Sequence, residues 1–235
     1  MKYLATVCLP PTGQDSAADA LVAALAPFDL NNDRDEPADI WAAWDWWAVP
    51  THGALPLKPE HRGDPRVAWA ELPDGNLVVL AAPKAAIDFA TMRREAAEHA
   101  AGTWDAWAAV ASAHPPALPR AHFDATCDPA DAQRLYLLQP AIQEVALAAA
   151  TQQHPYFTFP VLLADPVAQF SGDRDAFVAR AAAVAFATYA YITLDGAWVT
   201  QFTDDRGWDA HVLAMTDYLD ALPDDTVLAV VKCHI

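Results

Sequence analysis

The fold is indicated most directly by one stretch of sequence, Arg66-Val67-Ala68-Trp69-Ala70-Glu71-Leu72-Pro73-Asp74-Gly75-Asn76-Leu77-Val78-Val79-Leu80. Two runs rich in apolar residues flank Pro73-Asp74-Gly75, and a short loop containing Asp-Gly is typical of a β-hairpin. A second stretch has the same pattern, because residues 188–193 and 197–200 flank Leu194-Asp195-Gly196. The sequence therefore predicts two β-hairpins.

The segments outside the hairpins alternate between strands and helices. The terminal segments 2–9 and 226–234 are apolar, and we expect both to be strands of one sheet. Apolar periodicity or composition predicts helices over about 17–27, 85–113, 129–150, 173–187 and 207–221. This order predicts an α+β protein, with a ferredoxin-like antiparallel or mixed sheet and helical insertions. We expect residues 1–235 to form a single domain, in which the proline-rich residues 114–120 mark the place for any subdivision.

Three residues mark the expected ends or breaks of these helices. Ser16 can cap the first helix, because a serine hydroxyl satisfies a free N–H group of the first turn. Gly102 is expected to break or kink the helix over 85–113. Pro140 would lie in the first turn of a new helical segment that follows Gln139.

The charge of the chain excludes several classes of partner. The formal net charge is −17, from 31 acidic and 14 basic residues. No run of Lys or Arg is long enough to neutralise a phosphate backbone, so we expect neither direct nucleic-acid binding nor attraction to an anionic membrane. No stretch is apolar enough for a membrane span, and the apolar N-terminal run is too short for a signal peptide. We expect a soluble protein.

The cysteines do not form a disulfide or metal pattern. Their odd number, 3, is typical of a protein from the reducing cytoplasm. Cys233 and His234 are neighbours on an expected strand, so their side chains point to opposite faces and cannot easily share one metal ion. Cys8 and Cys233 belong to strands that we expect to be central, where thiols are inert, whereas Cys127 lies in a loop near His122. We predict no metal site and no cofactor, since phosphate-cradling motifs are absent from the sequence.

Four of the 9 tryptophans lie within seven residues, at positions 41, 44, 46 and 47. On a strand, Trp44 and Trp46 would share one face, and Asp45 and Trp47 the other. On a helix, Trp41 and Trp44 would share a face instead. One face would fill the core while the other stacks on a ligand or receives a partner. Asp45 would accept an indole N–H or cap a turn.

The segment after the cluster, residues 50–66, is interrupted by prolines and glycines and is expected to be a loop. It carries His52 and His61 together with Arg62 and Asp64. Such groups, held on a loop by a scaffold, are common in binding and catalytic sites. The same histidines are also typical of an ordinary exposed loop.

Two segments resemble an uncharacterised protein family from actinobacteria and their phages. Residues 44–47, Trp-Asp-Trp-Trp, resemble the family's W-D-W-[YW] element, and residues 222–235 are similar to its ending, L-P-D-D-T-x-L-x-V-V-D-C-H-I. Tyr136, Gln139-Pro140 and residues 186–198 fit the middle of the family pattern. The family's Gly-Gly-Arg-Trp stretch is missing after Trp47, and Lys232 replaces an Asp. The resemblance implies kinship rather than a chemistry, and it directs attention to residues 48–64.

These observations favour a binding function and leave two alternatives open. The first hypothesis is a cytoplasmic acidic protein that binds a protein partner or a small apolar or aromatic ligand. An enzyme of unassigned chemistry, with His and Asp groups from the 50–66 loop, is one alternative. A phage- or defence-linked protein that binds a basic partner through its negative charge is the other. The oligomeric state is left open. The candidate site residues are Trp44, Asp45, Trp46, Trp47, His52, His61 and Asp64.

Overall fold

The chain forms two compact units of different architecture. The structure, a computed structural model, describes residues 2–31, 44–51, 55–152, 154–200 and 207–234. Unit 1 consists of Met1–Met92 and Phe186–Ile235, and unit 2 of Arg93–Ala185. The presence of helices together with a mixed sheet confirms the α+β prediction. Residues 114–120 lie inside unit 2, and the expectation of a single folding domain stays a prediction.

Unit 1 is built around a seven-stranded mixed sheet. Six strands follow the order β3-β4-β7-β1-β5-β6, and β2 also pairs with β7. The pairing of β1 with β5 is parallel and the other pairings are antiparallel. The strands are β1 (Lys2–Leu9), β2 (Trp46–Ala48), β3 (Ala68–Glu71), β4 (Leu77–Pro83), β5 (Ala190–Ile192), β6 (Trp198–Thr200) and β7 (Val227–His234).

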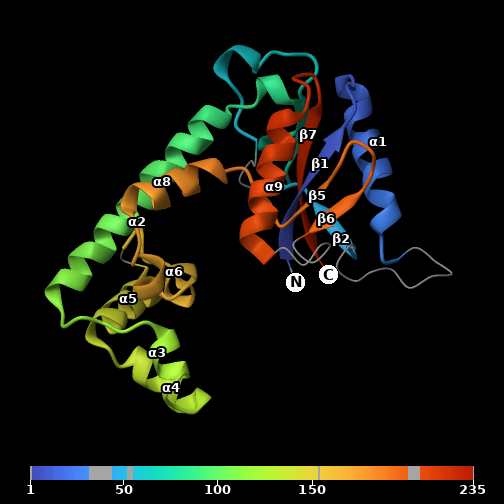
Figure 1. The fold of residues 1–235 in the computed structure, drawn as a ribbon. Helices are drawn as coiled ribbons and strands as arrows, with labels where there is room; N and C mark the ends of the chain where they lie inside the picture. Colours follow the sequence, from blue (N-terminus) through green and yellow to red (C-terminus); the bar gives the residue numbers. More distant parts are fainter. Residues whose placement is uncertain (1, 32–43, 52–54, 153, 201–206, 235) are drawn as a thin grey trace. The chain divides into compact units, whose positions relative to one another are not determined.

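The two terminal strands lie side by side within the sheet. β1 and β7 pair along their whole length, from Lys2 opposite His234 to Leu9 opposite Val227. Most of their residues are buried on both faces, as expected for central strands. This pairing confirms that the first and last strands share one sheet, and it brings the start of β1 next to the end of β7 (Figure 1).

Both predicted hairpins are present. β3 pairs with β4, and β5 pairs with β6. Gly75 and Gly196 have φ angles of +82° and +86°, which glycine adopts without steric cost. The ferredoxin-like arrangement is not confirmed, because the sheet has seven strands and β5, the first strand of its hairpin, lies beside β1.

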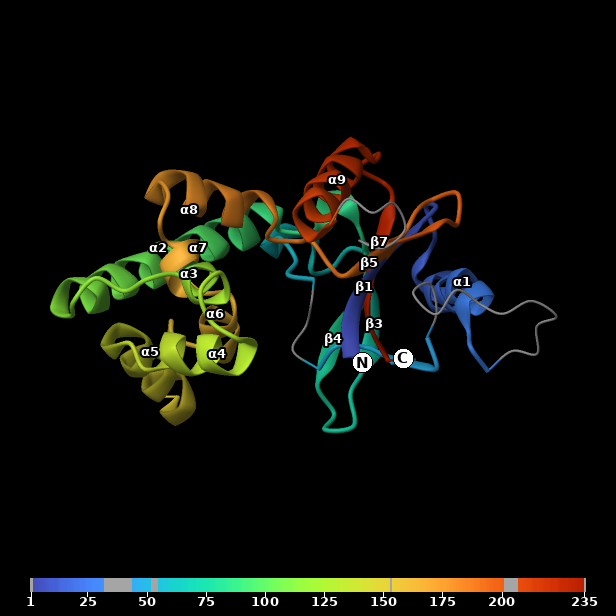
Figure 2. The ribbon, with the colours of Figure 1, turned by 60° about the horizontal axis from the view of Figure 1, so that its bottom comes forward.

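Helices α1 (Gln14–Leu25) and α9 (Gly207–Ala221) cover opposite faces of the sheet (Figure 2). The α1-side core contains Leu21 and Leu25 packed with Val7, and the α9-side core contains Met215 packed with Leu228. The 3-10 helices among the described residues of this unit are η1 (Ala26–Phe28), η3 (Pro59–His61) and η4 (Lys84–Ala86).

The predicted cap of the first helix is wrong. The N-cap residue of α1 is Gly13, and the hydroxyl of Ser16 lies inside the first turn and donates to the Gly13 carbonyl. A capping side chain belongs to the residue just before the first turn, whereas Ser16 is the third residue of α1.

Unit 2 is helical and has its own core, formed by aromatic and aliphatic residues that include Trp107, Tyr136 and Ile142. The break predicted at Gly102 is absent, because α2 runs through this glycine without interruption. The ring of Tyr156 packs directly on Gly102. Pro140 begins a new helix, as predicted.

None of the helices described in either unit combines the length and apolar character needed to cross a membrane. The helices are α2 (Phe89–Ala113), which begins in unit 1, α3 (Arg120–Asp124), α4 (Pro129–Leu137), α5 (Pro140–Thr151), α6 (Phe159–Leu163), α7 (Pro166–Gln169) and α8 (Arg174–Ala183).

Candidate ligand-binding site

Two tryptophans of the cluster belong to the core. Trp44 retains 9% of its exposure and packs in the α1-side core, where its Nε1 donates to the carbonyl of Leu25 at 3.0 Å. Trp47 is partly buried against the same core and lies opposite Cys233 in the β2–β7 pairing. The hydrogen bond of Trp44 and the packing of both residues give them a structural role.

Trp46 points to the other face of the sheet. It is 39% exposed and lies opposite His234 in the β2–β7 pairing. The indole and imidazole rings are nearly parallel, with an interplanar angle of 10° and centroids 5.5 Å apart. The stack covers part of the Trp46 ring and leaves the rest open to another molecule.

The predicted sharing of faces is therefore wrong. Trp44 groups with Trp47 in the α1-side core, while the Asp45 side chain reaches the ring that Trp46 stacks on. The physical reason is that β2 begins only at Trp46, and Asp45 occupies a bend. Strict alternation holds only within a paired strand.

Asp45 and His234 form a close polar pair. The Nδ1 atom of His234 lies 2.8 Å and 3.0 Å from the two carboxylate oxygens of Asp45. An ionised carboxylate only accepts hydrogen bonds, so Nδ1 carries the proton and the neutral ring keeps Nε2 as an acceptor. Asp45 was expected to accept an indole N–H or cap a turn, and it bonds the imidazole instead.

The backbone around Asp45 is held at two points. Its N–H donates to the carbonyl of His234 at 2.9 Å, and its own carbonyl accepts from Nδ2 of Asn31 at 2.7 Å. These bonds fix the bend from which the carboxylate reaches the imidazole. The pair is consequently oriented by the sheet rather than by a loose loop.

The neighbouring side chains form a continuous surface that we call the Trp46–His234 face. Lys2 lies opposite His234, and Lys232 lies opposite both Leu4 and Ala48. The Lys2 ammonium is 5.8 Å from the Trp46 ring centroid, a cation–π arrangement. Leu4 is 39% exposed, whereas residues further along the same face, such as Cys8, are buried in the α9-side core. The face consists of Lys2, Leu4, Trp46, Ala48, Lys232 and His234.

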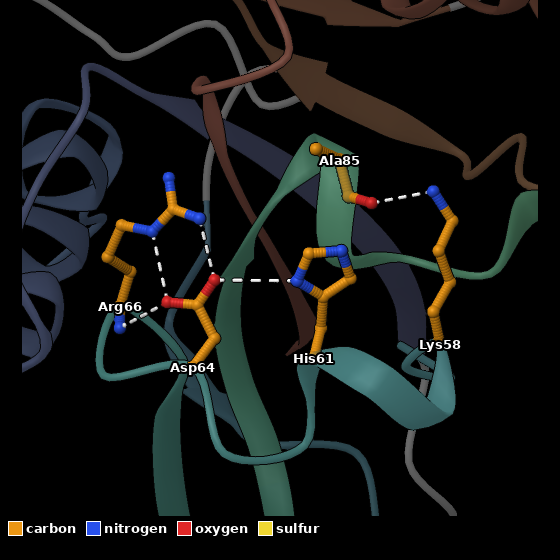
Figure 3. Close-up of polar contacts among 5 residues, drawn as sticks. All are labelled: Lys58, His61, Asp64, Arg66 and Ala85. Carbon is orange, nitrogen blue, oxygen red and sulfur yellow. Dashed lines mark hydrogen bonds and ion pairs between the residues drawn. The ribbon is translucent and has the colours of Figure 1, made fainter.

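The loop residues form a separate group (Figure 3). Asp64 accepts two hydrogen bonds from the Arg66 guanidinium, at 3.0 Å and 2.6 Å, and a third from the Arg66 backbone. These bonds hold the pKa of the Asp64 carboxyl far below its ordinary value. His61 Nδ1 lies 3.5 Å from the same carboxylate, and Lys58 donates to the carbonyl of Ala85 at 2.7 Å.

The structure thus places the predicted site residues in different surroundings. His61 and Asp64 come together, but no hydrogen bond, ion pair or ring contact among the described residues joins them to the Trp46–His234 face. His52 lies outside the described residues. The Asp64 carboxylate is hydrogen-bonded to Arg66, and this contact stabilises the turn over residues 64–66. Of the predicted residues, Asp45 and Trp46 are the ones associated with the open face.

The C-terminal strand shows the alternation expected for Cys233 and His234. Cys233 is buried in the α1-side core, and His234 lies on the Trp46–His234 face. Burial raises the pKa of both the Cys233 and the Cys8 thiol to about 12. Sequence reasoning overlooked Lys2, Lys232 and His234 as site residues. The signal for a shared face was the spacing of two residues between Lys2 and Leu4 on β1 and between Lys232 and His234 on β7.

The arrangement offers aromatic stacking, positive charge and one accepting imidazole nitrogen. Within the described part of the chain, no group of three or more His, Cys, Asp or Glu side chains is placed to hold a metal ion. Comparison of the chain with known protein families, curated proteins and solved structures finds no match. The chemistry of the face must therefore be argued from its own residues.

Proposed function

We propose that this chain is a binding protein and that its ligand packs on the Trp46–His234 face. The observation that carries the proposal is the exposed indole of Trp46, stacked at 10° on an imidazole that a carboxylate holds in place. A large aromatic ring left 39% exposed beside an exposed leucine supplies apolar contact area to a planar ligand. Preorganisation of the stack lowers the entropic cost of binding.

The test uses a neutral aromatic probe, 2-naphthamide, and two matched variants. We expect the probe to shift the NMR signals of the Trp46 indole N–H and of the His234 ring. Trp46→Ala removes the stacking surface and should abolish the shift at His234. Trp69→Ala is the control, because Trp69 is also 39% exposed and lies on β3 of the same sheet. Equal shifts at His234 in wild type and Trp46→Ala would contradict the proposal.

A second candidate function, an enzyme that uses general-base catalysis, is supported by the Asp45–His234 pair. A carboxylate on Nδ1 orients the imidazole and stabilises the imidazolium that forms when Nε2 accepts a proton. His234 is then the general base, in place of the loop histidines considered from the sequence. We expect hydrolysis of p-nitrophenyl acetate to be at least tenfold faster with wild type than with His234→Asn. Equal rates would remove this candidate.

The proposed kinship with the actinobacterial and phage family is supported by the position of its two motifs. Residues 44–47 lead into β2, which pairs with the end of β7, so that Trp47 lies opposite Cys233 and Asp45 is bonded to His234. Two motifs far apart in sequence thus lie side by side in the sheet. The negative charge of the chain as a whole still agrees with a basic partner, but such a partner would use another surface, since this face carries Lys2 and Lys232.

A further inference from the structure

The basic residues of this acidic chain are distributed in an uneven way. Five arginines pair with a carboxylate among the described residues, in the pairs Arg66–Asp64, Arg94–Glu98, Arg120–Asp124, Arg134–Asp131 and Arg174–Asp105. The sequence has four lysines. Two of them are used by the fold, because Lys58 donates to the carbonyl of Ala85, and Lys84 donates to the carbonyls of Asp220 and Leu222.

The other two lysines both lie on the Trp46–His234 face. Lys2 is directly opposite His234, and Lys232 is the next residue of β7 on that face. This diagonal position places their Cα atoms about 7–8 Å apart, within reach of one small anion. No described carboxylate forms an ion pair with either ammonium, although the chain carries 31 acidic residues. From these positions the long side chains can bring both ammonium groups to one anion, whose negative charge would offset the repulsion between them.

The size of the anion follows from the charge of the whole protein. A formal net charge of −17 repels polyanions such as nucleic acids and acidic proteins at long range. Two lysines are too few to offset that repulsion across many phosphates. A single carboxylate is repelled far less, and at this site Lys2 and Lys232 supply two positive charges against the one negative charge of Asp45. The exposed ring of Trp46 next to both lysines favours an aromatic group on the same ligand.

We infer that the Trp46–His234 face binds a small aromatic carboxylate. The ring of the ligand extends the stack of Trp46 and His234, and its carboxylate lies between the ammonium groups of Lys2 and Lys232. This inference rests on the proposed binding function and adds the charge and chemical class of the ligand. The imidazole, fixed by Asp45, completes the polar edge of the site.

The test compares two probes of the same shape, 2-naphthoate and neutral 2-naphthamide, by NMR titration. Wild type is expected to bind the carboxylate at least tenfold more tightly than the amide. The double variant Lys2→Gln/Lys232→Gln should bring the two dissociation constants to within a factor of about two. Arg62→Gln/Arg94→Gln is the matched control for loss of two positive charges, because both arginines are exposed and outside the face. Inorganic phosphate should bind more weakly than 2-naphthoate, since it lacks a ring.

The outcomes separate this inference from the function on which it rests. Equal affinity of wild type for the two probes, with shifts at Trp46, would overturn the carboxylate inference and leave the binding function standing. A preference that survives in Lys2→Gln/Lys232→Gln would also overturn it, since the charge would then come from elsewhere. If neither probe shifts Trp46 or His234, both proposals fail. Thermal unfolding of each variant establishes that it is folded.

Discussion

The Nδ1 atom of His234 lies 2.8 Å from a carboxylate oxygen of Asp45, although the two residues are 189 positions apart along the chain. Their backbones are joined as well, since the N–H of Asp45 donates to the carbonyl of His234 at 2.9 Å. The sheet therefore fixes the geometry of the pair, and the stack with Trp46 fixes the plane of the ring. This relationship defines the candidate site.

The tautomer of His234 is expected to depend on Asp45. The carboxylate can only accept, so the neutral ring should carry its proton on Nδ1. Asp45→Asn removes this requirement and should shift the neutral ring toward the Nε2–H form, measured by long-range ¹H–¹⁵N NMR. Asp74→Asn is the control, because Asp74 accepts its hydrogen bonds from Asn76 in the turn between β3 and β4, and no hydrogen bond among the described residues joins it to the Asp45–His234 pair. A wild-type ring protonated on Nε2 would contradict the assigned hydrogen bond.

Trp44 and Trp46 should differ strongly in their contribution to stability. Trp44→Ala opens a cavity in the α1-side core and should lower the free energy of unfolding by about 3–5 kcal/mol. Trp46→Ala removes one cross-strand contact and should cost about 0.2–1 kcal/mol. Urea unfolding measures both values. Equal losses would mean that Trp46 belongs to the core, and the binding proposal would lose its basis.

The stability of unit 1 should depend on the ionisation of Asp64. Its pKa is lowered in the folded state by the Arg66 guanidinium, so below about pH 4, the ordinary carboxyl pKa, the unfolded chain binds more protons than the folded one. Stability from this group is present above that pH and is lost as the pH falls toward the folded pKa. In acid unfolding curves, Asp64→Asn should reduce the loss of stability that accompanies the fall in pH. An unchanged acid slope would show that Arg66 does not stabilise the carboxylate.

The three thiols should react at very different rates. Burial raises the pKa of Cys8 and Cys233 to about 12, so almost no thiolate forms at about pH 8. Cys127 is partly exposed. Ellman's reagent should therefore titrate one thiol in the native protein and all 3 after unfolding in guanidinium. Cys127→Ser is the matched variant and should abolish the native reaction, whereas rapid reaction in that variant would contradict the burial of the other two.

Gly102 should be intolerant of a side chain for a reason found only in the packing. A Cβ atom there would lie 2.2 Å from Cζ of Tyr156, so Gly102→Ala forces the ring to move. The usual gain of about 1 kcal/mol for Gly→Ala in a helix should be reversed into a loss. In the Tyr156→Ala background the same substitution should be stabilising. Loss of stability in both backgrounds would assign the effect to the helix itself.

Local residue patterns are sufficient to predict much of the fold of this chain. Asp74-Gly75 and Asp195-Gly196 specify the two hairpins, because a short turn with positive φ needs glycine at that position. Pro140 specifies a helix start, and the apolar terminal segments specify buried strands. These signals act within a few residues, so they can be interpreted without knowledge of the tertiary structure.

The candidate site could not be predicted to the same extent, because its geometry depends on strand register. Only the pairing of β2 and β1 with opposite edges of β7 brings Trp46 and Lys2 to either side of His234. The bend at Asp45 placed Trp44 on the same side as Trp47, and α2 runs on through Gly102, where the ring of Tyr156 packs. Composition and turn chemistry thus determined the fold class and the hairpins. Tertiary structure alone decided which side chains meet, since contacts between residues 189 positions apart depend on the whole sheet.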